Sequence, residues 1–240
     1  MKQLNEFDDL LDLQAVDLEI DGLLEERSSL PALEQYKEAH EAAATASGEL
    51  EVIQEEAKRI RLALDKSDGE LTIAEEKRDA EERRLYDGGL NARETGALMA
   101  EVEMLKTKTA KMEVLTLDLM EERDNHQVVV DAKTATFEEI TANEERLKGV
   151  IKAAWAELDA EIARQEENKL GIVKLIEPEL MEAYEELRPI KDGVAVGRLI
   201  EGICGGCHLR LNEAEQIQAA KTSPPRCVHC RRLLVILPGI

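Results

Sequence analysis

Four cysteines, all between residues 204 and 230, constrain the fold of this 240-residue chain more than any other feature of its sequence. Cys204 and Cys207 form one C-x-x-C pair, and Cys227 and Cys230 form a second pair after an interval of nineteen residues. Each pair can wrap one side of a metal ion, so that four thiolates converge in the tetrahedral geometry that Zn²⁺ prefers. The spacing therefore predicts one structural Zn²⁺ per chain, held by these four cysteines.

Other interpretations of the same residues are open. The run from Cys204 to His208 also matches C-x-x-C-H, the attachment motif of c-type haem, although haem would leave the second pair unused. Redox-active cysteines of the thioredoxin kind need a βαβ context, and disulfides need an oxidising compartment. His208 or His229 could replace a thiolate as a ligand. Because four cysteines are already spaced as in a zinc ribbon, we expect both histidines to be exposed residues of the metal-binding turns, or knuckles. Gly202 suits a close approach of the backbone to the first knuckle.

The composition of the chain argues against a large globular core. Only 2% of the residues are aromatic, whereas 35% are charged. Abundant Ala, Leu, Glu, Lys and Arg with helical periodicity are typical of long helices and coiled coils. Residues 1–20 contain acidic side chains and no uninterrupted apolar core, and no run of eighteen apolar residues occurs. We therefore expect neither a secretory signal nor a membrane span, and a cytoplasmic protein.

Apolar and small residues recur at alternating spacings of three and four, which is the seam pattern of a left-handed coiled coil. The first series is Tyr36, Ala39, Ala43, Ala46, Leu50, Ile53, Ala57, Ile60, Leu64, Ser67, Leu71, Ala74, Arg78, Glu81 and Leu85. The second series is Leu98, Val102, Leu105, Thr109, Met112, Thr116, Leu119, Arg123, His126, Val130, Lys133, Phe137, Ile140, Glu144, Leu147, Ile151, Ala154 and Leu158, which Ile172 and Leu175 rejoin. The many alanines of the first series predict a closely packed partner helix.

Two interruptions divide this helical pattern. The first interruption is at residues 28–31. Pro31 disfavours helical conformation in the residue before it but fits the first turn of a new helix, which predicts a kink here. Residues 86–91 contain adjacent glycines, and Asn91 with Glu94 reads as a capping box that starts a new helix. Two helices of comparable length joined by a short turn should fold back as an antiparallel hairpin.

A hairpin that turns symmetrically about these glycines would place residue i opposite residue 178 − i. This register puts Trp155 near residues 23 and 24, as a packing anchor. Arg123, His126 and Glu144 are polar residues at seam positions, and we interpret them as residues that fix the register or extend to solvent rather than as a metal cluster.

The last fifth of the sequence has a different character. A short helix is predicted over residues 179–187, followed by strands over residues 194–200 and 233–237. Asn212 with Glu215 forms a second capping box, which starts a helix that runs through Ala220. The predicted fold is mainly α: a long, kinked, antiparallel coiled-coil hairpin over residues 1–187, then a small β-rich C4 zinc ribbon over residues 188–240.

Charge is distributed unevenly along the chain. The net charge is −21; residues 191–240 contain seven Lys or Arg and four Asp or Glu, so they carry +3 and residues 1–190 carry −24. Residues 191–240 contain no Phe, Tyr or Trp, so contacts to nucleic acid would rely on cations at phosphates rather than on base stacking. The candidate cations are Arg210, Lys221, Arg226, Arg231 and Arg232.

No sequence pattern in the chain supports an enzyme. We find no Ser-His-Asp grouping, no phosphate-binding Gly-rich loop after a strand and no acidic pair confined to a cleft. The many carboxylates fit a solvated helix face. The sequence therefore predicts a non-enzymatic protein without a small-molecule substrate.

The chain resembles the bacterial C4-type zinc-ribbon proteins that have an N-terminal coiled-coil hairpin. Their turn motif, Tyr-Ser-Gly followed by Asn-Pro-Lys-Glu-Leu, is similar to the segments 86–88 and 91–95, with Asp87, Ala92 and Thr95 as departures. Their ribbon is similar to segments 202–208 and 227–234, except that Arg231 stands where the family often has Gly. The resemblance implies nucleic-acid binding through the ribbon. The alternative it implies is a protein–protein adaptor or chaperone-like scaffold for transcription, secretion or motility components.

Overall fold

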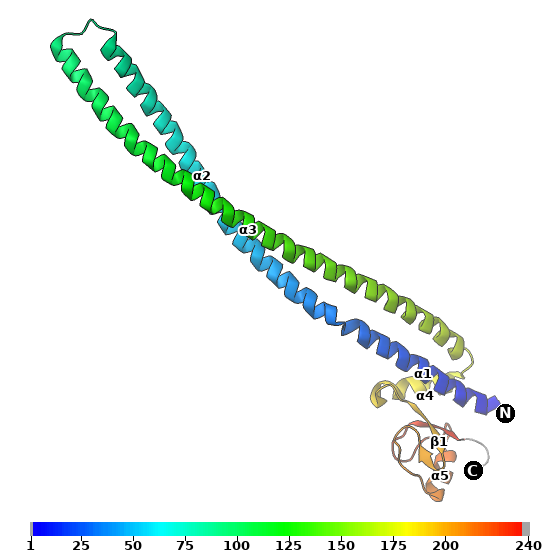
Figure 1. Cartoon of the computed structure of the whole chain (residues 1–240). Helices are drawn as coiled ribbons and strands as arrows, with labels where there is room; N and C mark the ends of the chain where they lie inside the picture. Colours follow the sequence, from blue (N-terminus) through cyan, green and yellow to red (C-terminus); the bar gives the residue numbers. More distant parts are fainter. Residues whose placement is uncertain (1, 237–240) are drawn as a thin grey trace. The chain divides into compact units, whose positions relative to one another are not determined.

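The computed structural model describes residues 2–236, with side chains from residue 7 onward. The fold is mainly helical, with one small three-stranded sheet near the C-terminus, which confirms the predicted fold class (Figure 1). The chain divides into two compact units: residues 34–148, and residues 1–33 together with residues 149–240. We call the first the hairpin unit and the second the base unit. The domain boundary predicted between residues 187 and 188 stays a prediction.

Three long helices make up most of the chain. They are α1 (Lys2–Ser28), α2 (Pro31–Tyr86) and α3 (Ala92–Val173). α1 ends just before Pro31, because a proline disfavours helical conformation in the residue that precedes it but fits the first turn of the next helix. Within the described residues, no helix combines the length and the apolar character that a membrane span requires.

The turn between α2 and α3 follows the predicted capping chemistry. Gly88 and Gly89 adopt left-handed conformations, with φ of 79° and 91°. The Asn91 side chain accepts a hydrogen bond from the backbone N–H of Glu94 at 3.0 Å, and the Glu94 carboxylate accepts one from the N–H of Asn91 at 2.9 Å. These reciprocal bonds satisfy free N–H groups at the start of α3 and so define where the helix begins.

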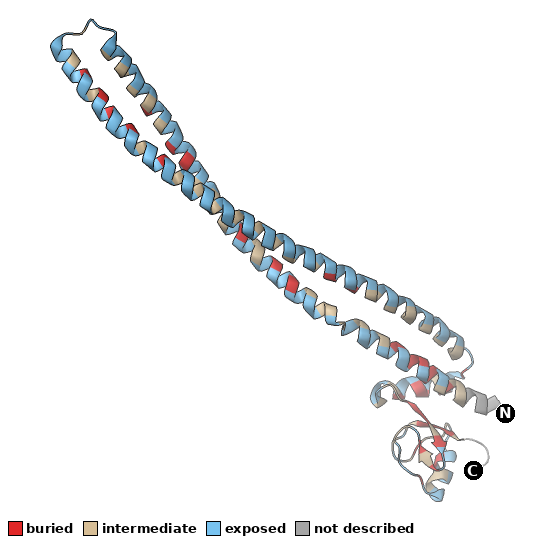
Figure 2. Ribbon diagram, viewed as in Figure 1, coloured by how far each residue is buried: buried red, intermediate tan, exposed pale blue. Residues whose placement is uncertain are grey.

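In the hairpin unit, α2 and α3 run in opposite directions, and their buried residues lie on the sides that face each other (Figure 2). All fifteen predicted seam residues of α2 are buried or half-buried, which confirms that seam. On α3 the prediction is wrong at Lys133, which is exposed while Thr134 takes the half-buried position, and at Leu175, which lies beyond the helix end and is 61% exposed. Lys133 instead reaches across to Glu49 at 2.7 Å.

The register of the hairpin differs from the predicted one by about a helical turn. The Ser67 hydroxyl meets the Thr116 hydroxyl at 2.9 Å within the seam, whereas a symmetric turn would place residue 111 opposite Ser67. Seam packing rather than the midpoint of the turn decides which side chains face each other, and buried Ser67 and Thr116 need each other as hydrogen-bond partners. His40 and Glu144 also pair across the helices, at 2.8 Å. Glu144 therefore contributes to the register, as expected of polar seam residues.

The other two polar seam residues behave differently from Glu144. Arg123 extends toward solvent and pairs with the neighbouring Asp124. The Nδ1 atom of His126 is buried and has no hydrogen-bond partner among the described residues.

The base unit has its own apolar core. Leu10 and Leu13 of α1 pack with helix α4 (Pro178–Leu187) and with the sheet; Tyr184 and Val196 are among the buried residues of this cluster. A short 3₁₀ helix, η1 (Pro189–Lys191), leads from α4 toward the sheet. Trp155 of α3 donates from Nε1 to the backbone carbonyl of Arg27 at 3.0 Å, so it packs at the end of α1, close to the predicted place.

The sheet contains three strands in the order β2-β1-β3. β1 (Val196–Ile200) pairs antiparallel with β2 (Ile203–Cys204) and parallel with β3 (Leu233–Ile236). Both predicted strands are present, but the first begins at Val196 rather than at residue 194. Leu237, the last residue of the second predicted strand, lies outside the described residues. Helix α5 (Glu213–Ala220) is capped at its N-terminus by Asn212, which forms the predicted capping box with Glu215.

Candidate metal centre

Two turns of matching geometry present the four cysteines. In the first turn, the N–H of Cys204 donates to the carbonyl of Leu209 at 3.0 Å, and the N–H of His208 donates to the carbonyl of Cys204 at 2.8 Å. In the second turn, the N–H of Cys227 donates to the carbonyl of Arg232, and the N–H of Arg231 donates to the carbonyl of Cys227, both at 2.9 Å. Each turn closes through a residue in the left-handed region, with φ of 59° at His208 and 66° at Arg231. Arg231 therefore adopts this conformation despite its Cβ.

The two turns bring all four sulfurs to one point. The Sγ atoms of Cys204 and Cys230 are 3.9 Å apart, as are those of Cys207 and Cys227, and all four lie within 4.8 Å of one another. Four sulfurs placed tetrahedrally at a Zn–S distance of about 2.3 Å are separated by about 3.8 Å. A disulfide needs sulfurs about 2.05 Å apart, and the four cysteines are free thiols. The donor set and its spacing are compatible with one structural Zn²⁺.

Glycines allow the backbone to approach the cluster closely. A Cβ at Gly197 would lie 2.6 Å from the backbone nitrogen of Gly206, so β1 can pass the first turn only with glycine at that position. Gly202 has φ of 78°, and a Cβ there would lie 2.8 Å from the Gln216 side chain, so its close approach is to α5 rather than to the first turn as predicted. The N–H of Gly206 points at the Cys204 sulfur at 3.4 Å, as expected around a metal-bound thiolate.

The thiols of the cluster are unequal. Burial raises the pKa of Cys204 to about 12, and it also raises the pKa of Cys227. Burial acts the same way on Cys230, but hydrogen bonds from the Arg232 backbone and from the neighbouring cysteines lower its pKa to about 7. The thiolate is the form of cysteine that binds metal, so a cation bound here would displace the thiol protons. Its positive charge would also stabilise thiolates whose burial is otherwise unfavourable.

Neither histidine belongs to the cluster. Among the described residues, the four cysteines are the one group of Cys, His, Asp and Glu whose ligand atoms converge in this way. His208 is exposed, and Nε2 of His229 lies 3.6 Å from the Glu215 carboxylate. Since both C-x-x-C pairs meet at one point, the arrangement also differs from a haem attachment site, which would use one pair alone.

The five predicted nucleic-acid contacts have different environments. Arg210, Lys221 and Arg231 are exposed, and Arg226 is half-buried. Arg232 is half-buried too, and its guanidinium donates to the carbonyl of Val194 at 2.6 Å and to that of Lys191 at 3.3 Å. The end of η1 and the segment before β1 are therefore tied to Arg232, the second residue after the second cysteine pair.

A further residue that joins the ribbon to α1 has no signal in the sequence. The Gln14 side chain, 9% exposed, donates to the carbonyl of Val196 at 3.1 Å and accepts from its N–H at 2.7 Å. Arg198 of β1 adds an ion pair with Asp8 of α1 at 2.6 Å. The Gln14 amide thus exchanges two hydrogen bonds with the backbone of β1, as a residue of a neighbouring strand would. Helical periodicity alone does not distinguish Gln14 from the other polar residues of α1.

The left-handed residue of the second turn leads to a prediction. Replacing Arg231 with Gly should stabilise the ribbon by about 0.5–1 kcal/mol, because relief of the Cβ strain exceeds the entropy that glycine adds to the unfolded chain. The difference is measured by comparing the unfolding temperature of the ribbon in the metal-loaded wild-type protein and the metal-loaded variant. Arg210→Gly is the matched control, and it should destabilise slightly, since Arg210 is not among the residues with positive φ. Equal effects of the two substitutions would contradict the assignment of strain to Arg231.

Comparison with known proteins places the chain in a family. Residues 13–192 match the CT398-like coiled coil hairpin domain, so the match ends before the first cysteine pair. An uncharacterised protein of Mycobacterium tuberculosis is 25% identical over 96% of this chain and 95% of its own length. Two solved structures share the fold: one from Mycobacterium smegmatis (TM-score 0.80, 19% identity, 98% of both chains) and CT398 from Chlamydia trachomatis (TM-score 0.64, 16% identity, 97% of this chain and 98% of that one). Since the matched residues cover most of the sequence, the chain belongs to the CT398-like coiled coil hairpin family.

Proposed function

We propose that this protein is a non-enzymatic scaffold in which one Zn²⁺, bound by the four cysteines, stabilises the ribbon. A site with four thiolate ligands has no open coordination position for a substrate, which is characteristic of structural rather than catalytic zinc. The ion would replace the hydrophobic core that so small a module lacks and cross-link its two turns. The hairpin unit would then offer surface to protein partners.

The environment of Arg232 is the observation that carries the scaffold proposal. Arg232, the second residue after the second cysteine pair, donates to carbonyls of its own chain, at Lys191 and Val194. Gln14 and Arg198 likewise connect β1 to α1. Polar groups of the ribbon are thus used for contacts within the base unit, which favours a fixed structural role for the ribbon.

Nucleic-acid binding is the second candidate, and the exposed cations of the ribbon favour it. Arg210, Lys221 and Arg231 are exposed, in a segment whose formal charge is +3 before metal binding. Four thiolates and one Zn²⁺ change that charge by −2, so any binding would depend on where these cations lie. Such contacts would be made to phosphates and would weaken steeply with salt.

A single experiment separates these two functions. The full-length protein, immobilised and loaded with zinc, is incubated with bacterial lysate with and without nuclease, in parallel with an Arg210→Glu/Lys221→Glu variant. As a scaffold, the protein should retain the same partner proteins after nuclease treatment, and the variant should retain them equally. Loss of the retained proteins on nuclease treatment and in the variant would instead support nucleic-acid binding.

A further inference from the structure

The dipeptide Asp-Gly has a chemistry of its own, because the backbone nitrogen of the glycine can attack the side-chain carboxyl group of the aspartate. Glycine has no Cβ to hinder this approach. The attack needs the nitrogen and the carboxyl carbon to come within about 3–3.5 Å in a suitable orientation. The dipeptide occurs four times in the chain, as Asp21-Gly22, Asp68-Gly69, Asp87-Gly88 and Asp192-Gly193. All four aspartates are exposed, so the backbone conformation decides which of them can react.

The first two glycines lie inside helices. Gly22 belongs to α1 and Gly69 to α2, where each backbone N–H donates to the carbonyl four residues before it. Asp21 is also held by an ion pair with Arg188 at 2.7 Å. The attack would require the glycine nitrogen to give up its hydrogen bond and its peptide to leave the helical conformation. The helices therefore protect both sites.

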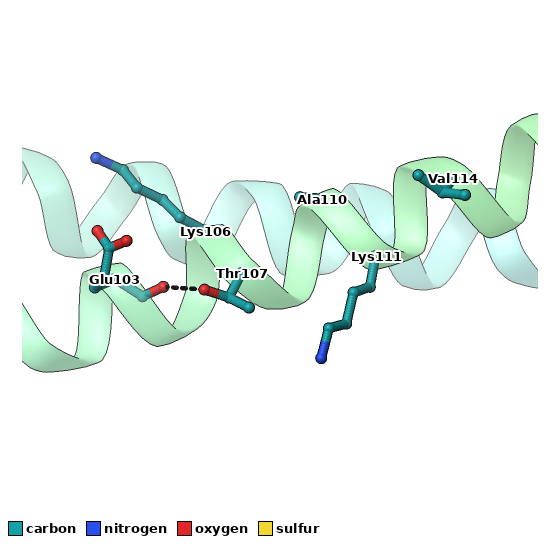
Figure 3. A pocket seen from close by; sticks show the side chains of 6 residues that line it. All are labelled: Glu103, Lys106, Thr107, Ala110, Lys111 and Val114. Carbon is teal, nitrogen blue, oxygen red and sulfur yellow. Dashed lines mark hydrogen bonds between the residues drawn. The ribbon is translucent and has the colours of Figure 1, made fainter.

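A side chain adds to this protection in α2. The Thr72 hydroxyl donates to the carbonyl of Asp68 at 2.9 Å, and this carbonyl belongs to the same peptide group as the nitrogen of Gly69. Figure 3 shows the same arrangement in α3, where the Thr107 hydroxyl donates to the carbonyl of Glu103. The Asp68-Gly69 peptide is thus fixed both at its N–H and at its carbonyl.

The fourth site is fixed by a turn and by packing. The N–H of Gly193 donates to the carbonyl of Arg188 at 3.0 Å. A Cβ at Gly193 would lie 2.8 Å from the Leu18 side chain, so this peptide lies tightly against α1. Although Asp192 is exposed, the nitrogen that would attack it is hydrogen-bonded and has little room to turn.

The third site, Asp87-Gly88, has neither kind of restraint. It lies in the turn between α2 and α3 of the hairpin unit (Figure 1). The N–H of Asp87 donates to the carbonyl of Arg83 at 3.0 Å, but the N–H of Gly88 has no hydrogen-bond partner within residues 2–236. A Cβ at Gly88 or Gly89 would meet no atom within 4 Å beyond its chain neighbours. The Gly88 nitrogen can therefore approach the carboxyl group without the loss of a hydrogen bond.

We propose that Asp87 isomerises spontaneously to isoaspartate in the folded protein, while the other three sites stay intact. In the first step the Gly88 nitrogen forms a bond with Cγ of Asp87, and the amide proton and the carboxyl hydroxyl leave as water, which closes a five-membered succinimide ring. In the second step water adds to the main-chain carbonyl carbon of Asp87 and breaks its bond to the Gly88 nitrogen. The chain then continues through Cγ, and its composition is unchanged. This inference does not depend on the proposed function.

The product would lengthen the turn by one backbone carbon and leave a carboxylate on Cα of residue 87. The turn can take up this carbon, since it is exposed and the next fixed contact along the chain is the capping box of Asn91 with Glu94. We therefore expect the seam and both helices to persist. An isoaspartyl carboxylate in an exposed turn is a substrate for methyltransferases that act on isoaspartate. The turn would thus carry a modification that accumulates with the age of the protein.

Peptide mapping of the full-length protein, aged in neutral buffer at physiological temperature, tests the proposal. Trypsin releases Asp87 in the peptide 85–93 and Asp68 in the peptide 67–77. The isoaspartyl and aspartyl forms of a peptide have the same mass, but they separate by chromatography and differ in electron-transfer fragmentation. The isoaspartyl fraction should be at least about tenfold higher at Asp87 than at Asp68, because reaction at Asp68 requires local opening of α2. The other two sites should stay as low as Asp68.

Unfolding and two substitutions serve as controls. In concentrated urea the four sites should react to similar extents, because the structure that protects three of them is lost. Asp87→Glu keeps the charge but would need a six-membered ring, so the same-mass isomer of the peptide 85–93 should disappear. Asp68→Glu, an equally conservative change at a protected site, should leave that isomer unchanged.

The outcomes that would overturn the proposal are distinct. They are equal isoaspartyl fractions at Asp87 and Asp68 in the folded protein, no isoaspartate at Asp87, and an isomer that persists in Asp87→Glu. The same preference for Asp87 in urea would also overturn it, because local sequence rather than structure would then select the site. Deamidation of Asn91 in the same tryptic peptide raises the peptide mass and is distinguished in that way.

Discussion

Replacement of Cys207 and Cys230 with serine is expected to abolish metal binding and unfold the ribbon, while the hairpin unit keeps its helical signal. Each substitution removes one ligand from a different turn, so neither half of the site remains complete. In small zinc modules the free energy of metal binding, about 10–16 kcal/mol at neutral pH, is in effect the free energy of folding. The buried apolar cluster around the site consists of Leu199, Leu211, Ala219 and Leu234 with two of the cysteines, and it is too small to replace the metal.

Three measurements check this prediction. Elemental analysis of the reduced wild-type protein should find one zinc per chain, and the double variant should contain none. Circular dichroism should change little, because α2 and α3 have their own seam, whereas limited proteolysis should cleave the variant within residues 202–232. His208→Ser/His229→Ser is the control, and it should retain the metal if the four thiolates are the ligands. A metal-free protein whose ribbon still resists proteolysis would refute the structural role of the ion.

Replacing Asp17 with Ala is expected to destabilise the base unit by about 2–3 kcal/mol, because it leaves the Tyr184 hydroxyl and the half-buried Lys169 ammonium without their partner. The Asp17 side chain is 1% exposed and accepts a hydrogen bond from the Tyr184 hydroxyl at 2.7 Å. The Lys169 ammonium forms an ion pair with Oδ1 of Asp17 at 2.7 Å, although the geometry is not that of a hydrogen bond. Nε of Arg188 lies 3.4 Å from Oδ2 of Asp17. One carboxylate thus joins α1, α3 and α4.

Tyr184 remains a hydrogen-bond donor to Asp17 across the working pH range. Burial, and next the hydrogen bond to Asp17, raise the pKa of its phenol well above the ordinary value. The tyrosine therefore stays neutral, and the effect of Asp17→Ala should not depend on ionisation of the phenol.

Urea unfolding followed by tryptophan fluorescence measures the effect of Asp17→Ala. Trp155 is the single tryptophan of the chain and lies in the base unit, so its emission reports on that unit. Asp21→Ala is the matched control: Asp21 pairs with Arg188 at 2.7 Å, but its side chain is 49% exposed, and its loss should cost less than about 1 kcal/mol. Similar midpoints for the two variants would show that the buried network contributes no more than a surface ion pair.

Features that depend on neighbouring residues could be predicted from the sequence. The capping boxes at Asn91 and Asn212 each join groups three residues apart, so the composition of one short segment determines where α3 and α5 begin. The cysteine spacing predicts one convergent cluster for a similar reason, since each pair needs only its own turn to present two sulfurs. The seam of α2 could be read because burial on one face of a helix repeats with the helical period.

The register of the hairpin and the contacts between residues far apart in the sequence were decided only by the tertiary structure. The sequence by itself determined that two helices pair, but several registers bury nearly the same apolar residues, and the contact between Ser67 and Thr116 belongs to one of them. Gln14, Asp17 and Arg232 look like ordinary surface residues in the sequence. Each becomes a fixed contact because folding removes it from water beside a partner far along the chain, where an unpaired polar group would be unfavourable.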